Sequence, residues 1–353
     1  MLKKEQMQFP MLEKNLEHQT TKEKKKFCLR PYREGDESGM LECIRDEYGE
    51  SYFKRDFYDL VKLRAKAQGD HYVFFVAETD GEIVGMEIFA LFYENGDDYI
   101  EPASQILKRC VRGYGLAREL VEYTFPLAKA MKPSALFVHA VTFHDITQHV
   151  CGAQGMVATG FRLGSFLADR MNNSYPRGKC LKHSEGVMIL PLEKKHAGKI
   201  FVSKELDGYI GKCYERLKMS YEICGKKEDY QHRKATLLWE KDELQRTVLI
   251  KVLRYGEDLI SQIQSLMAQQ REPYWTYQIS LPVDVGQAIT AYEQLKLLGF
   301  FFTGLKAACA QKEQIYMQWC GTMELYMEEY ALTEQFQNVR EHIQTFYDRR
   351  ERE

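Results

Sequence analysis

A glycine-containing turn, Arg112-Gly113-Tyr114-Gly115-Leu116-Ala117, has the residue types that bind phosphate groups through backbone atoms. Two glycines and an alanine leave little side-chain bulk, and glycine adopts the left-handed conformations that tight turns require. A helical pattern from Arg118 to Met131 follows, so successive N–H groups can face one concavity at a helix N-terminus. The turn lacks the lysine of a Walker A loop and the third glycine of a dinucleotide fingerprint. It predicts a phosphate or pyrophosphate site of another class, with a purely structural turn as the alternative.

The elements around this turn follow a recognisable order. Apolar runs and turn residues over Phe27 to Leu192 predict the order β-α-α-β-β-β-α-β-α-β-β. The clearest signal is a hairpin in which Asp80-Gly81 joins the runs Tyr72–Glu78 and Ile83–Ala90. An apolar run from Ala103 to Leu107 precedes the glycine turn. This alternation predicts the α/β class, with a mixed sheet flanked by helices.

The turn resembles the acyl-CoA loop of the GNAT acyltransferases, Arg/Gln-x-x-Gly-x-Gly/Ala, with Arg112, Gly115 and Ala117 at the three fixed positions. The order of elements is also the order of the GNAT fold. The resemblance implies acetyl-CoA, or another acyl-CoA, as co-substrate. The donor-binding residues that it implies are Leu107, at a strand edge that faces the pantetheine arm, and Arg112, Gly113, Tyr114, Gly115, Leu116 and Ala117.

Acyl transfer to an amine also needs a proton acceptor for the amine and a proton donor for the departing thiolate. The candidate bases are Glu87, Glu101 and His144, of which His144 is preferred because it lies at a strand end close to the expected thioester position. A structural role for each is the alternative. In the GNAT pattern that follows the strand ending near His144, a tyrosine, the usual acid, stands where this chain has Cys151. Cys151 is therefore either a poor substitute for that acid or a core residue.

The second half of the chain resembles a shortened copy of the first. The frame Gly155-x-x-x-Thr159-Gly160 recurs as Gly299-x-x-x-Thr303-Gly304, and Gly256 occupies the place of the glycine turn. Glu257 and Asp258 follow Gly256 directly, and their charges disfavour a pyrophosphate at a helix start. We therefore expect tandem GNAT-like domains, the first complete and the second degenerate and unable to bind CoA. The pattern Val141-Thr142-x-His144-x-x-x-Gln148 resembles that of an uncharacterised bacterial subgroup of such proteins.

Length and composition set the remaining bounds. With 353 residues and 44% hydrophobic content, we expect a mobile tail at 1–26, a GNAT domain at 27–195 and a degenerate domain with a C-terminal helix at 196–353. The net charge of −2 gives no reason to expect nucleic acid or a membrane surface as partner. Nine cysteines occur singly, which is typical of reduced thiols in the cytoplasm. No metal site is expected, because no carboxylate cluster supports the spaced histidines.

These observations predict a cytoplasmic N-acyltransferase that transfers an acyl group directly to an amine, with acetyl-CoA as the first expectation. The acceptor is expected to be a small-molecule or peptide amine, and a homodimer is left open. The alternative is a non-catalytic acyl-CoA-binding or scaffold protein, which the missing motif tyrosine favours and the glycine loop opposes.

Overall fold

The computed structural model shows two compact units, which divide between Val138 and His139. The boundary predicted between residues 195 and 196 lies outside the described residues. The structure describes residues 9–94, 97–168, 179–193, 198–269, 275–306 and 313–349.

Unit 1, which ends at residue 138, contains a mixed sheet with helices on both faces. Its strand order is β1-β2-β3-β4-β5-β6, antiparallel throughout except for the parallel β5–β6 pair. The strands are β1 (Leu12–Glu17), β2 (Lys24–Pro31), β3 (Tyr72–Thr79), β4 (Glu82–Glu94), β5 (Asp97–Leu107) and β6 (Ala135–Val141), the last of which continues into unit 2. The helical segments are α1 (Glu37–Tyr48), η2 (Arg55–Tyr58), α2 (Leu60–Gln68), η3 (Arg109–Val111) and α3 (Leu116–Ala130).

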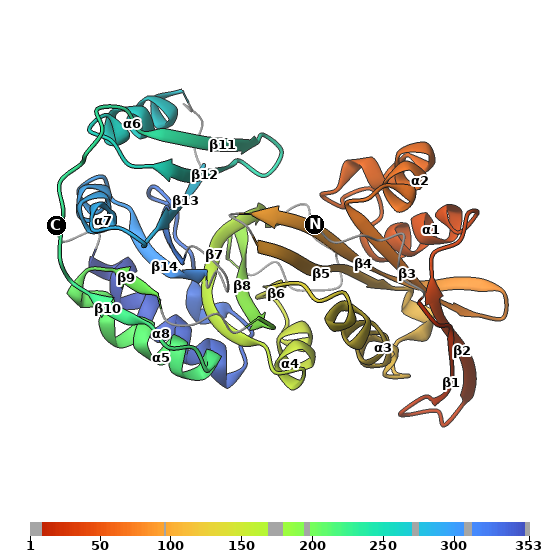
Figure 1. The fold of residues 1–353 in the computed structure, drawn as a ribbon. Helices are drawn as coiled ribbons and strands as arrows, with labels where there is room; N and C mark the ends of the chain where they lie inside the picture. The colour runs from red at the N-terminus through yellow and green to blue at the C-terminus, as the bar shows by residue number, and fades with distance from the viewer. Residues whose placement is uncertain are drawn as a thin grey trace. The chain divides into compact units, whose positions relative to one another are not determined.

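The two faces of this sheet are covered by different helices (Figure 1). Helices α1 and α2 pack on the face that carries Met86, Ile88 and Ile106, where a buried apolar cluster forms. Helix α3 covers the opposite face, where Thr124 of α3 hydrogen-bonds Glu87 of β4. The sheet of unit 1 therefore has an α1/α2 face and an α3 face, and alternate residues of β4 point to one or the other.

The N-terminal segment is not a mobile tail, and the expectation for residues 1–26 was wrong over the part that the structure describes. Strands β1 and β2 form an antiparallel hairpin that joins the sheet through β3. Residues of β1 alternate between half-buried and exposed, which is the pattern of an outer strand. Lysines and glutamates pair across the hairpin, as Lys26 and Glu13 do at 2.8 Å. The charge-rich composition concealed this alternation.

Within unit 2 the strand order is β8-β7-β14-β15-β13-β12-β11. Among the described pairs of this order, only β12–β13 is parallel. The strands in this order are β7 (Val157–Leu167), β8 (Lys182–Pro191), β11 (Thr236–Asp242), β12 (Thr247–Arg254), β13 (Thr276–Pro282), β14 (Phe301–Lys306) and β15 (Gln314–Trp319), and a separate parallel pair is formed by β9 (Lys199–Phe201) and β10 (Glu222–Cys224). The helical segments are α4 (Ile146–Ala153), η5 (Lys204–Leu206), α5 (Asp207–Leu217), α6 (Leu259–Ala268), α7 (Gln287–Leu297), η6 (Met327–Glu329) and α8 (Glu334–Arg349). The predicted α/β class, with a mixed sheet flanked by helices, is confirmed.

The order of elements repeats along the chain. The series β4, β5, α3, β6, α4, β7, β8 has the same types as the later series β11, β12, α6, β13, α7, β14, β15. The parallel pair β5–β6 corresponds to the parallel pair β12–β13, and the hairpin-like pair β7–β8 corresponds to β14–β15. Strand β11 is not among the elements that the sequence predicts.

The two Thr-Gly frames noted in the sequence meet in the sheet of unit 2. Strands β7 and β14 pair antiparallel with Gly160 opposite Gly304. A Cβ atom on Gly160 would lie 2.6 Å from the Cα of Gly304, and one on Gly304 would lie 2.5 Å from the Cα of Gly160. Both positions therefore need glycine, because any side chain would press directly on backbone.

Replacing Gly160 with alanine is expected to lower the free energy of unfolding by about 1–3 kcal/mol, the usual cost of overpacking a core. Gly211 of α5 is a matched control, because a Cβ there meets no atom within 4 Å and alanine favours helix. Urea unfolding of both variants would measure the difference. Equal stability of Gly160→Ala and the wild-type protein would show that the strands separate easily at this crossing.

Candidate functional site

The glycine turn presents a series of backbone N–H groups at the start of α3. Gly113 and Gly115 have φ angles of +86° and +74°, in the left-handed region that favours glycine. Within the part of the chain that the structure describes, the N–H groups of residues 113–117 have no hydrogen-bond acceptor. Tyr114 and Leu116 are buried, whereas Gly115 is exposed, so the turn reaches the surface at Gly115. Such an arrangement can accept an anion.

Acidic residues of α1 hold the segment that leads into this turn. Lys108 pairs with Glu42 at 2.9 Å, and Asp46 accepts the backbone N–H of Arg109 at 2.7 Å. The guanidinium of Arg112 forms an ion pair with Glu47. A phosphate would therefore have to compete with Glu47 for the Arg112 side chain, whereas the backbone N–H groups need no such exchange.

The β1–β2 hairpin packs on the other side of the turn. The backbone N–H of Gln19 donates to the carbonyl of Gly113 at 2.9 Å. The ring of His18 packs edge-on against Tyr114, with centroids 5.0 Å apart. A Cβ on Gly113 would lie 2.4 Å from Nε2 of His18. The hairpin thus fixes the conformation of Gly113, and the segment predicted to be a tail supports the candidate site.

Strand β5 leads toward the turn, and its edge next to β6 is only partly paired. Two residue pairs join β5 to β6 in the described ranges, Tyr99 with Ala135 and Ile100 with Leu136. In the described ranges no β6 partner is found for residues 102–107, which include Leu107. A strand edge of this kind can hydrogen-bond an extended ligand through its backbone.

The two carboxylates of unit 1 that the sequence suggests as bases, Glu87 and Glu101, lie on different strands, β4 and β5. Glu101 lies on β5 opposite Ala90 and is half-buried. Glu87 is 2% exposed and lies on the α3 face, where its carboxylate accepts a hydrogen bond from Thr124 at 2.9 Å. Burial raises the pKa of Glu87 to about 7, against the hydrogen bonds from Thr124 and Gln105 that lower it. Glu87 faces the interior beneath α3, which favours the structural alternative for this residue.

His144 and Cys151 belong to unit 2. Burial lowers the pKa of His144, partly offset by Asp145, so the imidazole is neutral at pH 7 and able to accept a proton. Its ring packs edge-on against Phe143, with centroids 4.9 Å apart. Cys151 is 4% exposed in α4, which fits its reading as a core residue better than that of an acid open to a substrate.

Gln148, which lies on the same helix, ties α4 to the C-terminal segment. Its Nε2 donates to the carbonyls of Val141 at 3.1 Å and Ala331 at 2.9 Å, and its Oε1 accepts the N–H of Thr333 at 3.0 Å. Ala331 and Thr333 are 183 and 185 residues away from Gln148, so no local pattern could have revealed these two contacts. Gln148 therefore positions the segment that carries His144.

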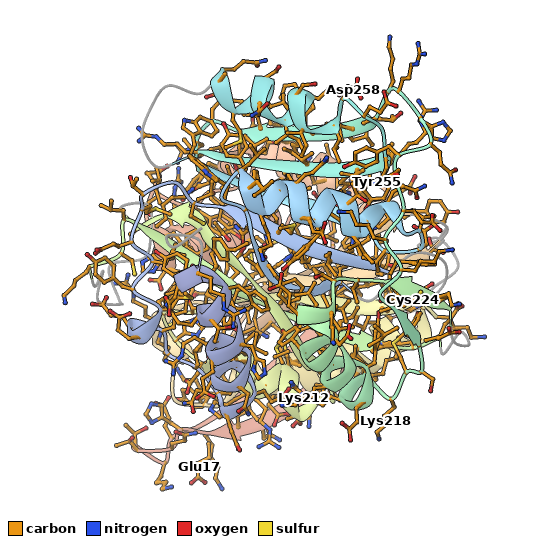
Figure 2. All side chains as sticks on the ribbon, turned by 90° about the vertical axis from the view of Figure 1, so that its left-hand side faces the viewer. Glu17, Lys212, Lys218, Cys224, Tyr255 and Asp258 are labelled. Carbon is orange, nitrogen blue, oxygen red and sulfur yellow. The ribbon has the colours of Figure 1, made fainter. Side chains whose placement is uncertain are left out.

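The second glycine turn, before α6, is covered by its own chain. Figure 2 labels Tyr255 and Asp258 at this turn. The segment 232–235 lies on it, and carbonyls of that segment accept the N–H groups of Glu257 at 3.0 Å and Asp258 at 3.3 Å. A Cβ on Gly256 would lie 2.3 Å from the backbone of the same segment. The N–H groups that could bind an anion in this turn are therefore already used.

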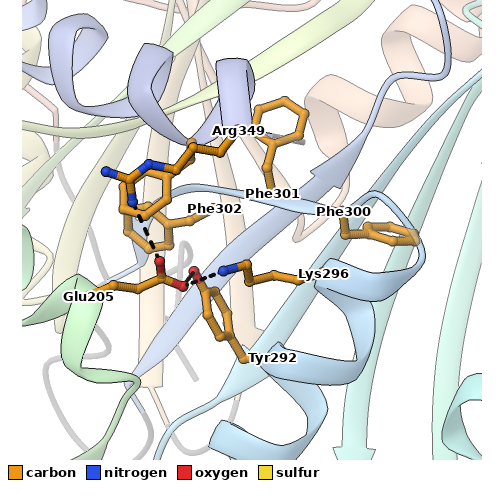
Figure 3. A pocket seen from close by; sticks show the side chains of 8 residues that line it. Glu205, Tyr292, Lys296, Phe300, Phe301, Phe302 and Arg349 are labelled. Carbon is orange, nitrogen blue, oxygen red and sulfur yellow. Dashed lines mark hydrogen bonds and ion pairs between the residues drawn. The ribbon is translucent and has the colours of Figure 1, made fainter. Parts of the chain in front are cut away.

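A small cavity in unit 2 has charged walls but little room. Glu205 lies between Lys296 and Tyr292, which contact its carboxylate at 2.9 and 2.8 Å, with Arg349 at 3.7 Å (Figure 3). Burial alone would raise the pKa of Glu205, but the hydrogen bonds from Lys296 and Tyr292 outweigh it and lower the pKa. The cavity measures about 20 Å³, which is space for one water molecule. It is a packed polar cluster and not a substrate site.

The residues that the structure describes contain no group of three or more His, Cys, Asp or Glu side chains arranged to hold a metal ion. None of the helices in the described ranges combines the length and the apolar character needed to cross a membrane.

Comparison with known proteins gives similarities of structure but not of sequence. No protein-family model matches the chain, and no curated protein matches it. The ribosomal-protein-S18-alanine N-acetyltransferase from Escherichia coli is similar over 47% of this chain and 94% of its own, with 12% identity and a TM-score of 0.37. The spermidine/spermine N-acetyltransferase from Vibrio cholerae covers the same shares, with 15% identity and a TM-score of 0.39. An N-acetyltransferase from Staphylococcus aureus Mu50 matches 47% of this chain and 99% of its own, with 16% identity and a TM-score of 0.38.

Proposed function

We propose that this chain is an acyl-CoA-dependent N-acyltransferase of the GNAT type. The observation that carries the proposal is the turn 113–117, whose N–H groups have no acceptor among the described residues and lie at the start of a 15-residue helix. Gly115 and Ala117 leave those groups accessible, and Arg112 completes the sequence pattern of the donor loop. The partly unpaired edge of β5, ending at Leu107, supports the route proposed for the pantetheine arm.

The proposed reaction is direct attack of an amine on the thioester. An alkyl ammonium has a pKa near 10.4, so a base must remove its proton at pH 7. We propose His144 as that base, supported by its neutral imidazole, with Glu101 as the second candidate. Acetyl-CoA is the proposed donor, and the acceptor is a small-molecule or peptide amine. The burial of Cys151 weakens the proposal that its thiol protonates the leaving group.

We also propose that residues 196–353 are a degenerate copy of the domain at 27–195. The repeated order of elements and the contact of Gly160 with Gly304 support a duplication. The copy would not bind CoA, because segment 232–235 uses the N–H groups of its glycine turn.

Calorimetric titration with acetyl-CoA and with free CoA tests both proposals. We expect one site per chain with micromolar affinity. Two sites would contradict the degenerate second copy. Absence of binding to folded protein would contradict the donor site and would leave the glycine turn with a structural role.

The alternative is a protein that binds acyl-CoA without transferring the acyl group. Cys151, at the position of the motif tyrosine, favours this alternative. Binding of acetyl-CoA without CoA release in the presence of a panel of amines, polyamines and peptides would support it.

A further inference from the structure

Ser104 has an unusual backbone conformation at a bulge in β5. Its φ angle is +52°, which is rare for a residue with a side chain. The register of β4 and β5 shifts here, because Ala103 pairs with Ile88 while Ile106 pairs with Met86. Ser104 and its neighbour therefore oppose the single residue Glu87. Bulges and strained residues of this kind re-aim side chains and are frequent at active sites.

The bulge directs the Ser104 hydroxyl toward two donors from the loop that follows α1. Tyr52 donates its phenol proton to Oγ at 2.8 Å, and Lys54 donates from Nζ, also at 2.8 Å. A hydroxyl oxygen has two lone pairs, so the hydrogen bonds from Tyr52 and Lys54 occupy both of them. Among the residues that the structure describes, no acceptor is found for the proton of the Ser104 hydroxyl. That proton is therefore available for a ligand.

The two donors are held in place by packing. Tyr52 is 3% exposed, and its ring lies 4.7 Å from that of Tyr48. The ammonium of Lys54 lies over the ring of Phe57, 5.5 Å from its centroid. An ammonium and a phenol that both donate to one hydroxyl make its remaining proton more acidic, because they stabilise the alkoxide that proton loss creates.

The position of Ser104 relative to the glycine turn fits the thioester end of an extended donor. Leu107, at the end of β5, lies between the turn and the bulge along the chain. Three residues of strand separate Leu107 from Ser104, a distance of about 10 Å. A pantetheine arm that starts from phosphates at Gly113–Ala117 and follows the β5 edge would bring its sulfur toward this hydroxyl. This step rests on the proposed function.

We infer that Ser104 is the acid that protonates the departing CoA thiolate, with Tyr52 and Lys54 as its positioning residues. As the amine nitrogen bonds to the thioester carbon, the C–S bond breaks and its electron pair goes to sulfur. The Ser104 hydroxyl gives its proton to that sulfur, and Lys54 Nζ returns a proton to Oγ. The proton of the attacking amine leaves through the base, and solvent restores the proton of Lys54.

This assignment removes the difficulty raised by Cys151. The motif position that carries tyrosine in the resembling family holds a buried thiol here. A serine on β5 supplies the missing proton from a different element. No local sequence pattern could have indicated it, since Ser104 is 50 residues from Lys54 and 52 residues from Tyr52.

The thiol of bound CoA provides a test that needs no acceptor. Its ionisation is followed by the ultraviolet absorbance of the thiolate as a function of pH, for CoA bound to the full-length protein. A hydrogen bond from Ser104 stabilises the thiolate, so the thiol pKa of bound CoA should lie below that of free CoA. Ser104→Gly should raise it by about one to two units, and Lys54→Met should shift it in the same direction.

The variant Ser104→Gly suits the backbone, because glycine adopts a positive φ without strain. Ser38→Ala, at an exposed position of α1, is the control and should leave the thiol pKa unchanged. An equal thiol pKa in wild-type and Ser104→Gly complexes would overturn the assignment of the acid while leaving the donor site intact. Failure of the wild-type protein to bind CoA would instead overturn the proposed function on which the assignment rests.

Discussion

Replacing Gly115 with leucine is expected to weaken CoA binding by about 100-fold. Gly115 is the N-cap of α3, and a Cβ there meets no atom within 4 Å, so a side chain would project into the space in front of the turn. It would displace a phosphate from N–H groups of the turn. Loss of one or two hydrogen bonds to a charged group corresponds to a change of this size. Calorimetric titration with CoA measures it directly.

The control for this variant is Gly81→Leu. Gly81 has a φ of +80° in the β3–β4 turn, and a Cβ there also meets nothing within 4 Å. Both variants carry the same backbone cost of about 1–2 kcal/mol for a left-handed residue. Only the Gly115 variant should lose affinity for CoA. Unchanged CoA affinity in folded Gly115→Leu would show that the glycine turn does not bind the donor phosphates.

Glu87→Gln is expected to make the protein more stable than the wild type at pH 8, by about 3 kcal/mol. The carboxyl of Glu87 has a pKa of about 7 in the folded chain, against an ordinary value of 4.5. Between these values the folded chain keeps the proton and the unfolded chain has lost it. The free energy of unfolding of the wild-type protein therefore falls as pH rises from 4.5 to 7, by about 1.4 kcal/mol per unit.

A glutamine cannot ionise and keeps a carbonyl that accepts the hydrogen bond from Thr124. The two proteins should have similar stability at pH 4.5 and diverge up to pH 7. Burial lowers the pKa of Lys182 to about 7, which makes stability rise with pH above 7 in both proteins. The difference between the two urea-unfolding series thus isolates Glu87.

Glu82→Gln serves as the matched control, because Glu82 is an exposed carboxylate on the same strand. Its stability should follow that of the wild type within about 0.5 kcal/mol at every pH. Parallel pH profiles for Glu87→Gln and the wild type would mean that water reaches the Glu87 carboxyl beneath α3.

Local patterns predicted much of the framework. The Asp80-Gly81 hairpin, the run before the glycine turn and the amphipathic α3 all have signals within a few residues. The Thr-Gly frames were also detectable, because the same spacing of residues occurs at 155–160 and at 299–304. Predictions failed where composition masked periodicity, as in β1, where lysines and glutamates surround the half-buried Leu12 and Leu16.

The candidate site was less predictable because its decisive contacts join distant residues. The sequence indicates the glycine turn, but it does not indicate that His18 packs on Gly113. Nor does it indicate that Tyr52 and Lys54 meet at Ser104, since a bulge with a positive φ at serine has no local signature. The sequence indicates that the acidic residues after Gly256 disfavour a pyrophosphate. It does not indicate that segment 232–235 accepts the N–H groups of Glu257 and Asp258.

The strand β7 has a neighbour on each side, β8 on one edge and β14 on the other. A fragment that ended near residue 195 would keep β8 and lose β14, so the edge that carries Gly160 would be open. An open edge of buried residues pairs readily with another chain. Two such fragments could meet through β7 as β7 meets β14, with glycine opposite glycine. Under the proposed duplication, β14 of the second copy takes the position on β7 that a second molecule would take in such a pair of fragments.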